Sequence, residues 1–170
     1  MSRVVLGIDP GPVNTAWLIL ADGAPRAFAI WPNEIVLDSL RSGFEDVDDV
    51  AIEKVESFGM SVGAEVFETV FWTGRFVQAL LEGRRGRETP VVTRIGRLKV
   101  KTTLCHDSRA KDSNIRQALI DRFGGSDAIG RKGSEGPLYG ISKDVWSALA
   151  IAVTHVDQEG IASSWHGGRK

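Results

Sequence analysis

Three acidic residues stand at points of the chain where a carboxylate could do chemistry. Asp9 follows the apolar run at residues 4–8 and precedes a Pro-Gly turn, Glu53 ends a second apolar run, and Asp144 opens a helical pattern. Carboxylate oxygens are the ligands that hard divalent cations prefer. Two such ions, roughly 4 Å apart, can cleave a phosphodiester bond. If the three acids converge, they form a metal centre of this kind.

Each acid also has a structural explanation. Aspartate often caps a turn of the kind that follows Asp9. An ionised glutamate that ends an apolar strand is costly unless it is paired, and Lys54 or a metal could pair with Glu53. The dipole of a helix favours an acid in its first turn, where Asp144 lies. Glu56, three residues after Glu53, competes with it as a ligand.

The elements that must position these acids follow from the hydrophobic pattern. Five segments have the pattern of strands: residues 3–8, 14–20, 26–31, 49–55 and 90–94. The first three follow one another directly, which predicts an antiparallel meander. If the strand at 49–55 is regular, Glu53 points to the face opposite Ile52 and Lys54.

Helical spacing predicts the remaining elements: residues 33–41, 62–82, 95–104, about 112–123, and 142–158. Asn33, Asp112 or Ser113, and Ser142 are the expected N-caps. The glycine-rich segment 124–141 is expected to be a mobile loop. The pattern predicts an α/β fold: one mixed sheet with helices on both faces.

Length and composition fit one domain, expected at residues 1–159, with a frayed tail from residue 160 to 170. A single cysteine excludes an internal disulfide and a cysteine-based zinc cluster. Without a signal-peptide pattern or an apolar run of about 18 residues, we expect a cytoplasmic protein with no membrane partner.

The net charge of −1 hides an uneven distribution. Acids concentrate between residues 34 and 68, and bases between residues 84 and 111. The bases are Arg84, Arg85, Arg87, Arg94, Arg97, Lys99, Lys101, Arg109 and Lys111. Such a segment indicates a polyanionic partner or simply a solvated basic face.

The three acid-bearing segments resemble the signature blocks of the RuvC family of Holliday junction resolvases. The blocks are Gly-Ile-Asp-Pro-Gly at 7–11, Ala-Ile-Glu-Lys-Val at 51–55, and Asp144 ahead of Ala-Leu-Ala-Ile-Ala-Val-Thr-His at 148–155. Order and spacing match over residues 3–156. Each block alone is weakly specific, but the three in order are a strong signal. The loops and the tail are more similar to phage or prophage members.

The resemblance implies a ribonuclease H-like fold with five strands, a homodimer, and paired nicking of four-way or otherwise branched DNA with Mg²⁺ or Mn²⁺, two ions per active site. Asp9 would bridge the ions, and Glu53 and Asp144 would each hold one. A water would attack the phosphate in line and leave 5′-phosphate and 3′-hydroxyl ends. The family's fourth acid falls on Ser147, a weak neutral ligand, so one metal would bind poorly. Asp144 would then hold that metal alone, or Ser147 or Glu56 would complete the site.

The resemblance also bears on DNA contacts. Lys101 and Lys111 fall near basic positions that the family uses at its cleft, and a lysine there could stabilise phosphate charge. Lys99, Arg97 and Arg94 belong to the same basic stretch. Phe58, followed by Met60, falls where the family probes the junction centre, and an apolar wedge can unstack bases. A core or loop role for these two residues is equally compatible with the sequence.

Three classes of function therefore stand side by side. The leading hypothesis is a metal-dependent, structure-selective endonuclease. The second is a branched-DNA-binding module that has lost one acid, at Ser147. The third is a kinase-like phosphotransferase, because its opening Asp-Gly loop superficially resembles residues 9–11. A chain of 170 residues is too short for the two lobes of that architecture.

Overall fold

The computed structural model describes residues 3–44, 47–83 and 88–161. The regular elements are β1 (Val4–Asp9), β2 (Asn14–Ala21), β3 (Ala24–Pro32), α1 (Asn33–Ser42), β4 (Asp49–Lys54), α2 (Ala64–Leu81), β5 (Val91–Gly96), α3 (Arg97–Cys105), α4 (Asp112–Arg122), the 3-10 turn η1 (Gly125–Ala128), β6 (Gly130–Arg131), β7 (Ser134–Glu135) and α5 (Val145–Gln158). Every strand and helix expected from the hydrophobic period is present, within a few residues of its expected bounds.

Five strands form one mixed sheet in the order β3-β2-β1-β4-β5. The meander β1-β2-β3 is antiparallel, as predicted, whereas β4 and β5 continue the sheet parallel to β1. β1 is therefore the central strand, and it is paired on both sides. Its carboxyl end lies beside that of β4, so Asp9 and Glu53 come to the same edge of the sheet.

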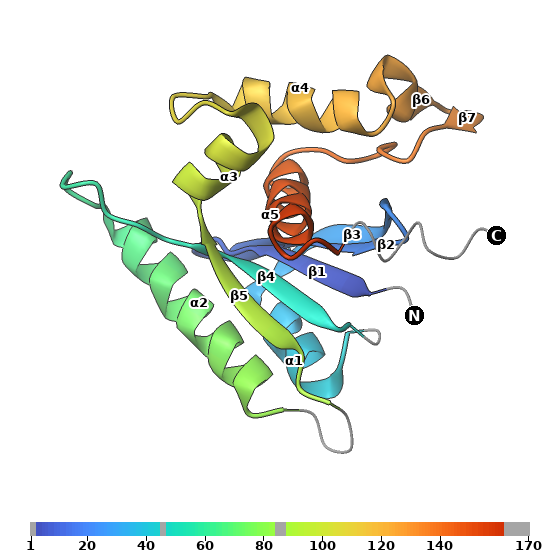
Figure 1. The fold of residues 1–170 in the computed structure, drawn as a ribbon. Helices are drawn as coiled ribbons and strands as arrows, with labels where there is room; N and C mark the ends of the chain where they lie inside the picture. The colour runs from blue at the N-terminus through green and yellow to red at the C-terminus, as the bar shows by residue number, and fades with distance from the viewer. Residues whose placement is uncertain (1–2, 45–46, 84–87, 162–170) are drawn as a thin grey trace.

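Helices cover both faces of this sheet, and each face has its own core (Figure 1). On one face, α1 and α2 pack on side chains such as Leu6, Ile8 and Ile52. On the other face, α5 packs on Val5, Ala51 and their neighbours, and α3 and α4 join the same core. Successive side chains of β1 and β4 point alternately into these two cores, as the period of two in a strand requires.

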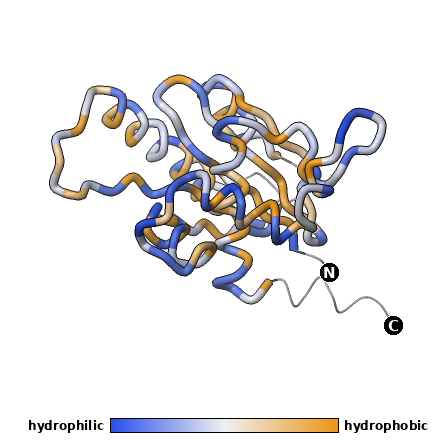
Figure 2. The backbone as a smooth tube through the Cα atoms, turned by 90° about the horizontal axis from the view of Figure 1, so that it is seen from above, coloured by the Kyte–Doolittle hydropathy of each residue, from blue (hydrophilic) through white to orange (hydrophobic). Residues whose placement is uncertain are grey.

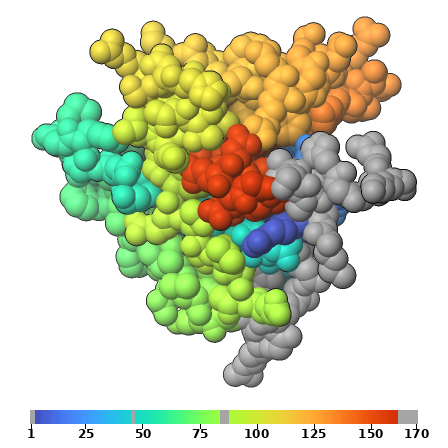
Figure 3. Space-filling view, viewed as in Figure 1, coloured from blue at the N-terminus to red at the C-terminus, as the bar shows by residue number. Residues whose placement is uncertain are grey.

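The close approach of α5 to the sheet depends on Gly7. A Cβ built on Gly7 would lie 2.2 Å from the carbonyl oxygen of Ala148 and 2.9 Å from Cβ of Ala152. Only glycine therefore leaves room for α5 at this distance. Figure 3 shows α5, in red, enclosed by α3, α4 and the strands. This tight contact fixes the amino end of α5, which carries Asp144, relative to β1.

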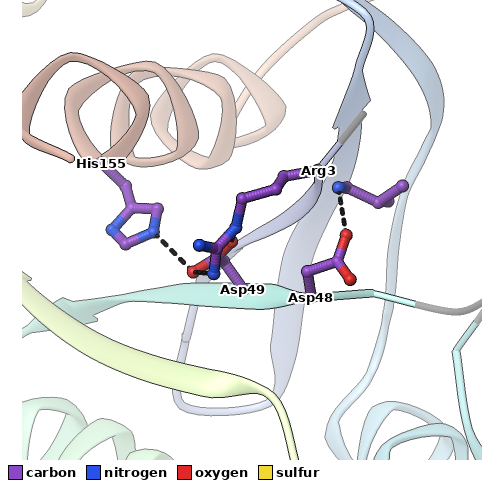
Figure 4. Close-up of polar contacts among 5 residues, drawn as sticks. Arg3, Asp48, Asp49 and His155 are labelled. Atoms are coloured by element: carbon purple, nitrogen blue, oxygen red, sulfur yellow. Dashed lines mark hydrogen bonds and ion pairs between the residues drawn. The ribbon is translucent and has the colours of Figure 1, made fainter. Parts of the chain in front are cut away.

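A buried polar network ties the start of β4 to α5 and to the N-terminal segment (Figure 4). Asp49 is 1% exposed and accepts hydrogen bonds from Nε and Nη2 of Arg3 at 2.6 and 2.7 Å. Nε2 of the fully buried His155 lies 3.3 Å from Oδ1 of Asp49. Next to it, Oδ2 of Asp48 accepts the backbone N–H of Val4 at 2.7 Å. A buried carboxylate needs such partners.

The expected helix caps are wrong. The cap position of α1 is Pro32, and Asn33 is already helical. α4 begins after Lys111, whose backbone N–H donates to Oδ1 of Asn114 at 2.8 Å. α5 is preceded by Asp144 at its cap position, without a side-chain cap from Ser142. Tertiary hydrogen bonds and turns outweigh the local capping preference at these ends.

The glycine-rich segment 124–141 is not an unstructured loop. It contains η1 and the two-stranded hairpin β6-β7, and the backbone N–H of Leu138 donates to the carbonyl oxygen of Ala128 at 2.8 Å. Leu138 and Ala128 are buried in the core beneath. The hairpin itself is hydrophilic in Figure 2, where apolar residues concentrate in the strands and α5. The segment is therefore an ordered lobe anchored by a few apolar side chains.

No helix within the described ranges is long and apolar enough to cross a membrane. The expected tail at 160–170 lies almost entirely outside the described residues, which end at Ile161. The same is true of Arg84, Arg85 and Arg87.

Candidate functional site

Asp9 and Glu53 lie together at one edge of the sheet. Each ends or nearly ends its strand, and each follows the alternation onto the face covered by α5. Ile8 and Ile52, the residues before them, point into the opposite core. The carboxyl groups of Asp9 and Glu53 come within hydrogen-bonding reach of each other. Strand period and parallel register thus produce the pair.

The environment of this pair disfavours two negative charges. Burial raises the pKa of Asp9 to about 9, with further contributions from the hydrogen bond and charge of Glu53 and from the charge of Asp144. Arg97 acts in the opposite direction and lowers the pKa of Asp9. At neutral pH the pair therefore carries a proton or attracts a cation.

Arg97, the first residue of α3, is the cation beside the pair. Its Nη1 lies 3.8 Å from Oε1 of Glu53, and its Nη2 is paired with Oδ1 of Asp112. The sequence suggested Arg97 as a DNA contact and gave no sign that it would reach the acids. Because α3 follows β5 directly, the end of β5 delivers its side chain to the strand ends.

Asp144 and Ser147 stand at the amino end of α5. Asp144 is exposed and Ser147 half-buried. The charge of Asp144 is near enough to raise the pKa of Asp9. Even so, no three Asp, Glu, His or Cys side chains in the described ranges gather tightly enough to hold a metal ion. The close cluster is the pair Asp9–Glu53, and Asp144 borders it.

Glu56 is engaged elsewhere. Nζ of Lys54 donates to Oε1 of Glu56 at 3.0 Å. The Glu56 carboxylate also lies against Gly96, where a Cβ would come within 2.1 Å of its Oε2. Lys54 thus pairs with Glu56 and leaves Glu53 to Asp9 and Arg97.

A cleft of about 510 Å³ opens where α3, α4 and the amino end of α5 meet. Arg97, Asp144 and Ser147 line it, so it is continuous with the edge that holds the acids. Across from them, the guanidinium carbon of Arg116 lies 4.7 Å from the ring centroid of Trp146. The sequence pattern gives no sign that Arg116 and Trp146 lie beside the acids.

The other basic residues suggested by the sequence fall in two places. Lys99 and Lys101 are on α3, and Lys111 precedes α4. This α3–α4 arm lies over α5 in Figure 1, on the acid-bearing face of the sheet. Arg94 points to the opposite face and lines a cavity of about 220 Å³ against α2, with Val70 and Thr73.

Phe58 and Met60 lie in the segment between β4 and α2, and their side chains are 67% and 78% exposed. A core role is thereby excluded. Figure 1 shows that this segment extends away from the body of the molecule, on the side of α2 and α3. Two large apolar side chains exposed in this way are available to a partner.

Asn33, predicted as a helix cap, instead positions the turn that follows Asp9. Its side chain is buried, its Oδ1 accepts from Oγ1 of Thr15 at 2.7 Å, and its Nδ2 donates to the carbonyl oxygen of Gly11 at 2.9 Å. It thereby holds the turn that follows Asp9 against β2 and β3. In the sequence, Asn33 is a polar residue between two apolar segments. A helix cap explains such a residue as well as a tertiary hydrogen bond does.

Comparison with solved structures shows the fold. The Thermus thermophilus RuvC structure has a TM-score of 0.65 and 19% identity, over 94% of this chain and 98% of that one. T. thermophilus RuvC in complex with a Holliday junction substrate has a TM-score of 0.65 and 21% identity, over 94% and 97%. The fold is therefore RuvC-like, of the ribonuclease H-like class. No protein-family model and no curated protein matches the sequence.

The acid pair has the chemistry of a divalent cation site. The carboxyl groups of Asp9 and Glu53 lie close together, and the pKa of Asp9 is strongly raised. This is expected at a site where a bound cation replaces the proton. Mg²⁺ and Mn²⁺ favour such ligands and keep several waters. The residues fit one such ion at Asp9 and Glu53, with Asp144 and the Ser147 hydroxyl at its border.

Proposed function

We propose that this protein is a divalent-metal-dependent endonuclease that cuts four-way junctions and other branched DNA by paired nicks. The observation that carries the proposal is the Asp9–Glu53 pair, half-buried at adjacent strand ends within a RuvC-like fold. T. thermophilus RuvC has been captured with a Holliday junction substrate, which makes branched DNA the first substrate to test.

In this proposal Asp9 and Glu53 hold an Mg²⁺ or Mn²⁺ ion, and Asp144 with Ser147 borders a second position. When bound, the metal supplies an activated water and neutralises charge at the phosphate, leaving 5′-phosphate and 3′-hydroxyl ends. Glu56, paired with Lys54, contributes as a ligand only if that ion pair opens. Ser147 lacks a charge, so the second position binds its cation weakly.

The cations of the chain orient the DNA. Arg97, 3.8 Å from Glu53, is placed to contact a phosphate at the acids through charge-assisted hydrogen bonds. Lys99, Lys101 and Lys111 on the α3–α4 arm would bind neighbouring phosphates, which makes affinity fall with rising salt. Arg94, on the opposite face, would serve a dimer partner or a more distant DNA arm. Phe58 would insert at the junction centre.

Residues 1–159 act as a single nuclease domain, and two copies form a homodimer whose two sites cut opposing strands. Paired nicking requires two sites at a fixed separation, which a closed twofold dimer provides.

The decisive experiment is a nicking assay on immobile four-way, flap and duplex DNA with Mg²⁺ or Mn²⁺. We expect wild type to nick branched DNA and Asp9→Asn to lose at least about a hundredfold in rate, because it removes a carboxylate ligand. Asp38→Asn, an exposed isosteric change on α1, is the matched control and should retain full activity.

The variant Ser147→Asp tests the missing acid. We expect it to increase the nicking rate at limiting Mn²⁺, because it restores a carboxylate beside Asp144. Nicking by Asp9→Asn at the wild-type rate would refute the nuclease assignment. Tight junction binding with no nicking in either metal would instead identify a binding module that has lost an essential ligand.

A further inference from the structure

The cleft beside the acids is lined by apolar side chains on one part of its surface and by aromatic and charged side chains on another. Its floor is apolar and buried, formed by Ile115, Ile141 and Ala150, which are 5%, 8% and 2% exposed. One wall carries Trp146 with the Arg116 guanidinium over its ring. A site that combines an apolar floor, an aromatic face and a few polar groups is typical of a pocket for a planar organic group.

Charge narrows the class of ligand. Three cations (Arg97, Arg116 and Lys143) and two acids (Asp112 and Asp144) line the cleft. Arg97 already pairs with Asp112, so the charges that remain favour an anionic ligand. A stacked guanidinium and indole give a flat surface with donors at its edge, which suits a nucleobase. A nucleotide has both the planar base and the negative phosphate that such a cleft requires.

The position of the cleft connects it to the reaction. Asp144 and Ser147 belong to both the cleft and the acid edge, and Arg97 bridges the two through Glu53 at 3.8 Å. The cleft is therefore next to the position where Asp9 and Glu53 would hold a phosphate. Lys143, which also lines the cleft, precedes Asp144 and has a left-handed φ of 49°.

We propose that this cleft binds the base of one nucleotide next to the cleaved phosphate, against Arg116 and Trp146, and so sets the sequence preference of cleavage. The inference rests on the nuclease function proposed above and adds a base-binding subsite to it. Because the Arg116 guanidinium already covers the Trp146 ring, the base stacks on the outer face of the guanidinium, and the indole holds that guanidinium in place.

The test separates stacking from cleavage. Four-way junctions carry 2-aminopurine at each position flanking the expected cut and are bound to protein in the non-cleaving Asp9→Asn background with Ca²⁺. Fluorescence should change at one flanking position, and the change should disappear in Arg116→Ala and Trp146→Leu. Trp146→Phe keeps an aromatic face and should retain it. Circular dichroism melting confirms that each variant is folded.

The second readout is the cleavage profile of otherwise wild-type protein on junctions with all four bases at that position. We expect Arg116→Gln to reduce the preference between best and worst base by about tenfold, mainly because cleavage at the best base becomes slower. Arg109→Gln removes one charge on the same arm, outside the cleft, and should weaken binding equally for all four bases.

Two results would overturn the inference in distinguishable ways. If wild type nicks junctions but the base profile and the 2-aminopurine signal are the same in Arg116→Gln, Trp146→Leu and wild type, the cleft does not read a base and the nuclease function stands. If wild type neither binds nor nicks branched DNA, the proposed function fails and the subsite fails with it.

Discussion

At the scale of single residues, the pair Asp9–Glu53 makes folding depend on pH in a direction opposite to that of most carboxylates. The pKa of Asp9 rises from 3.8 to about 9 on folding. Between these values the folded state binds more protons than the unfolded state, so stability falls as pH rises. Most acids that are ion-paired in the native state have the opposite sign. The site is thus stabilised by a proton or by a cation.

We therefore predict that Asp9→Asn stabilises the metal-free protein. At pH 8 its unfolding temperature should exceed that of wild type by about 2–4 °C, equivalent to about 1 kcal/mol. The difference should shrink as pH falls toward 3.8, because Asp9 then becomes protonated in the unfolded state as well. Thermal melts after treatment with a chelator measure this directly. Mn²⁺ should then raise the melting temperature of wild type more than that of the variant.

Asp38→Asn on the exposed surface is the control, and its melting temperature should follow wild type at every pH. Equal melting temperatures of Asp9→Asn and wild type at pH 8 would show that the carboxyl is not held against Glu53 as described. A difference that stays constant from pH 4.5 to pH 8 would point to a packing effect instead of a charge effect.

The sequence predicts the position of a side chain well where the prediction uses the period of a strand or helix, and poorly where it uses a local preference such as helix capping. The alternation of side chains along β4 correctly predicted that Glu53 and Ile52 lie on opposite faces of the sheet. A strand that is buried on both faces cannot shift its register without exposing apolar side chains. The cap at Asn33 was wrong because its side chain bonds to Thr15 and Gly11, which are distant in sequence. Arg97 was missed as a partner of Glu53 for the same reason.

At the scale of elements, the contact between β1 and α5 determines where Asp144 lies. Gly7→Ala would place a Cβ 2.2 Å from the Ala148 carbonyl oxygen, a backbone atom that cannot move alone. We predict that this change lowers the stability by about 1–3 kcal/mol or more, as overpacking does. It should also lower nicking in the fraction that folds, because α5 must shift away from the sheet.

Gly74→Ala is the matched control for that prediction. Gly74 lies within α2 with nothing within 4 Å of a built Cβ. The substitution should stabilise the protein by about 0.5–1 kcal/mol, the usual gain of alanine over glycine in a helix. Urea unfolding measures both. Equal stabilities of Gly7→Ala and wild type would contradict the close packing of α5.

Elements were predicted well where the hydrophobic period is long, as in α2 and α5, and poorly where the chain turns. Lys143 adopts a left-handed conformation before Asp144, which no sequence rule predicts for lysine because the conformation costs roughly 1–2 kcal/mol. The segment 124–141 has a glycine content typical of loops. Its order depends on the burial of Leu138 and Ala128, residues that carry no local signal.

At the scale of the whole molecule, the sequence predicts the sheet and its two helical layers because strands and helices alternate with clear periods. The α3–α4 arm and the cleft beneath it could not be predicted. Both depend on the contact of α3 with α5, which places the arm over α5. These two helices are about 45 residues apart in the chain. The order of strands in the sheet determines where Asp9 and Glu53 meet, whereas the position of the α3–α4 arm determines where the cleft lies.

The outer face of α2 supports the last prediction, that the protein is a homodimer. Phe67, Val70 and Phe71 are 65%, 49% and 58% exposed on consecutive turns of this helix. Helix α2 lies on the side of the sheet opposite the α3–α4 arm (Figure 1). A contiguous apolar face of this kind on a helix usually contacts another protein surface. A second copy of the same helix would cover it with like residues and leave both acid edges open.

We expect sedimentation velocity to give twice the mass of the chain for wild type and a single-chain mass for Phe67→Glu, because a buried glutamate in the interface lacks a partner. Leu98→Glu, at an exposed apolar position on α3, is the control and should remain dimeric. The Phe67→Glu monomer should fold normally, nick only one strand of a four-way junction per encounter, and so lose simultaneous cleavage of opposing strands. A monomeric wild type that still makes paired cuts would exclude α2 as the element that couples two sites.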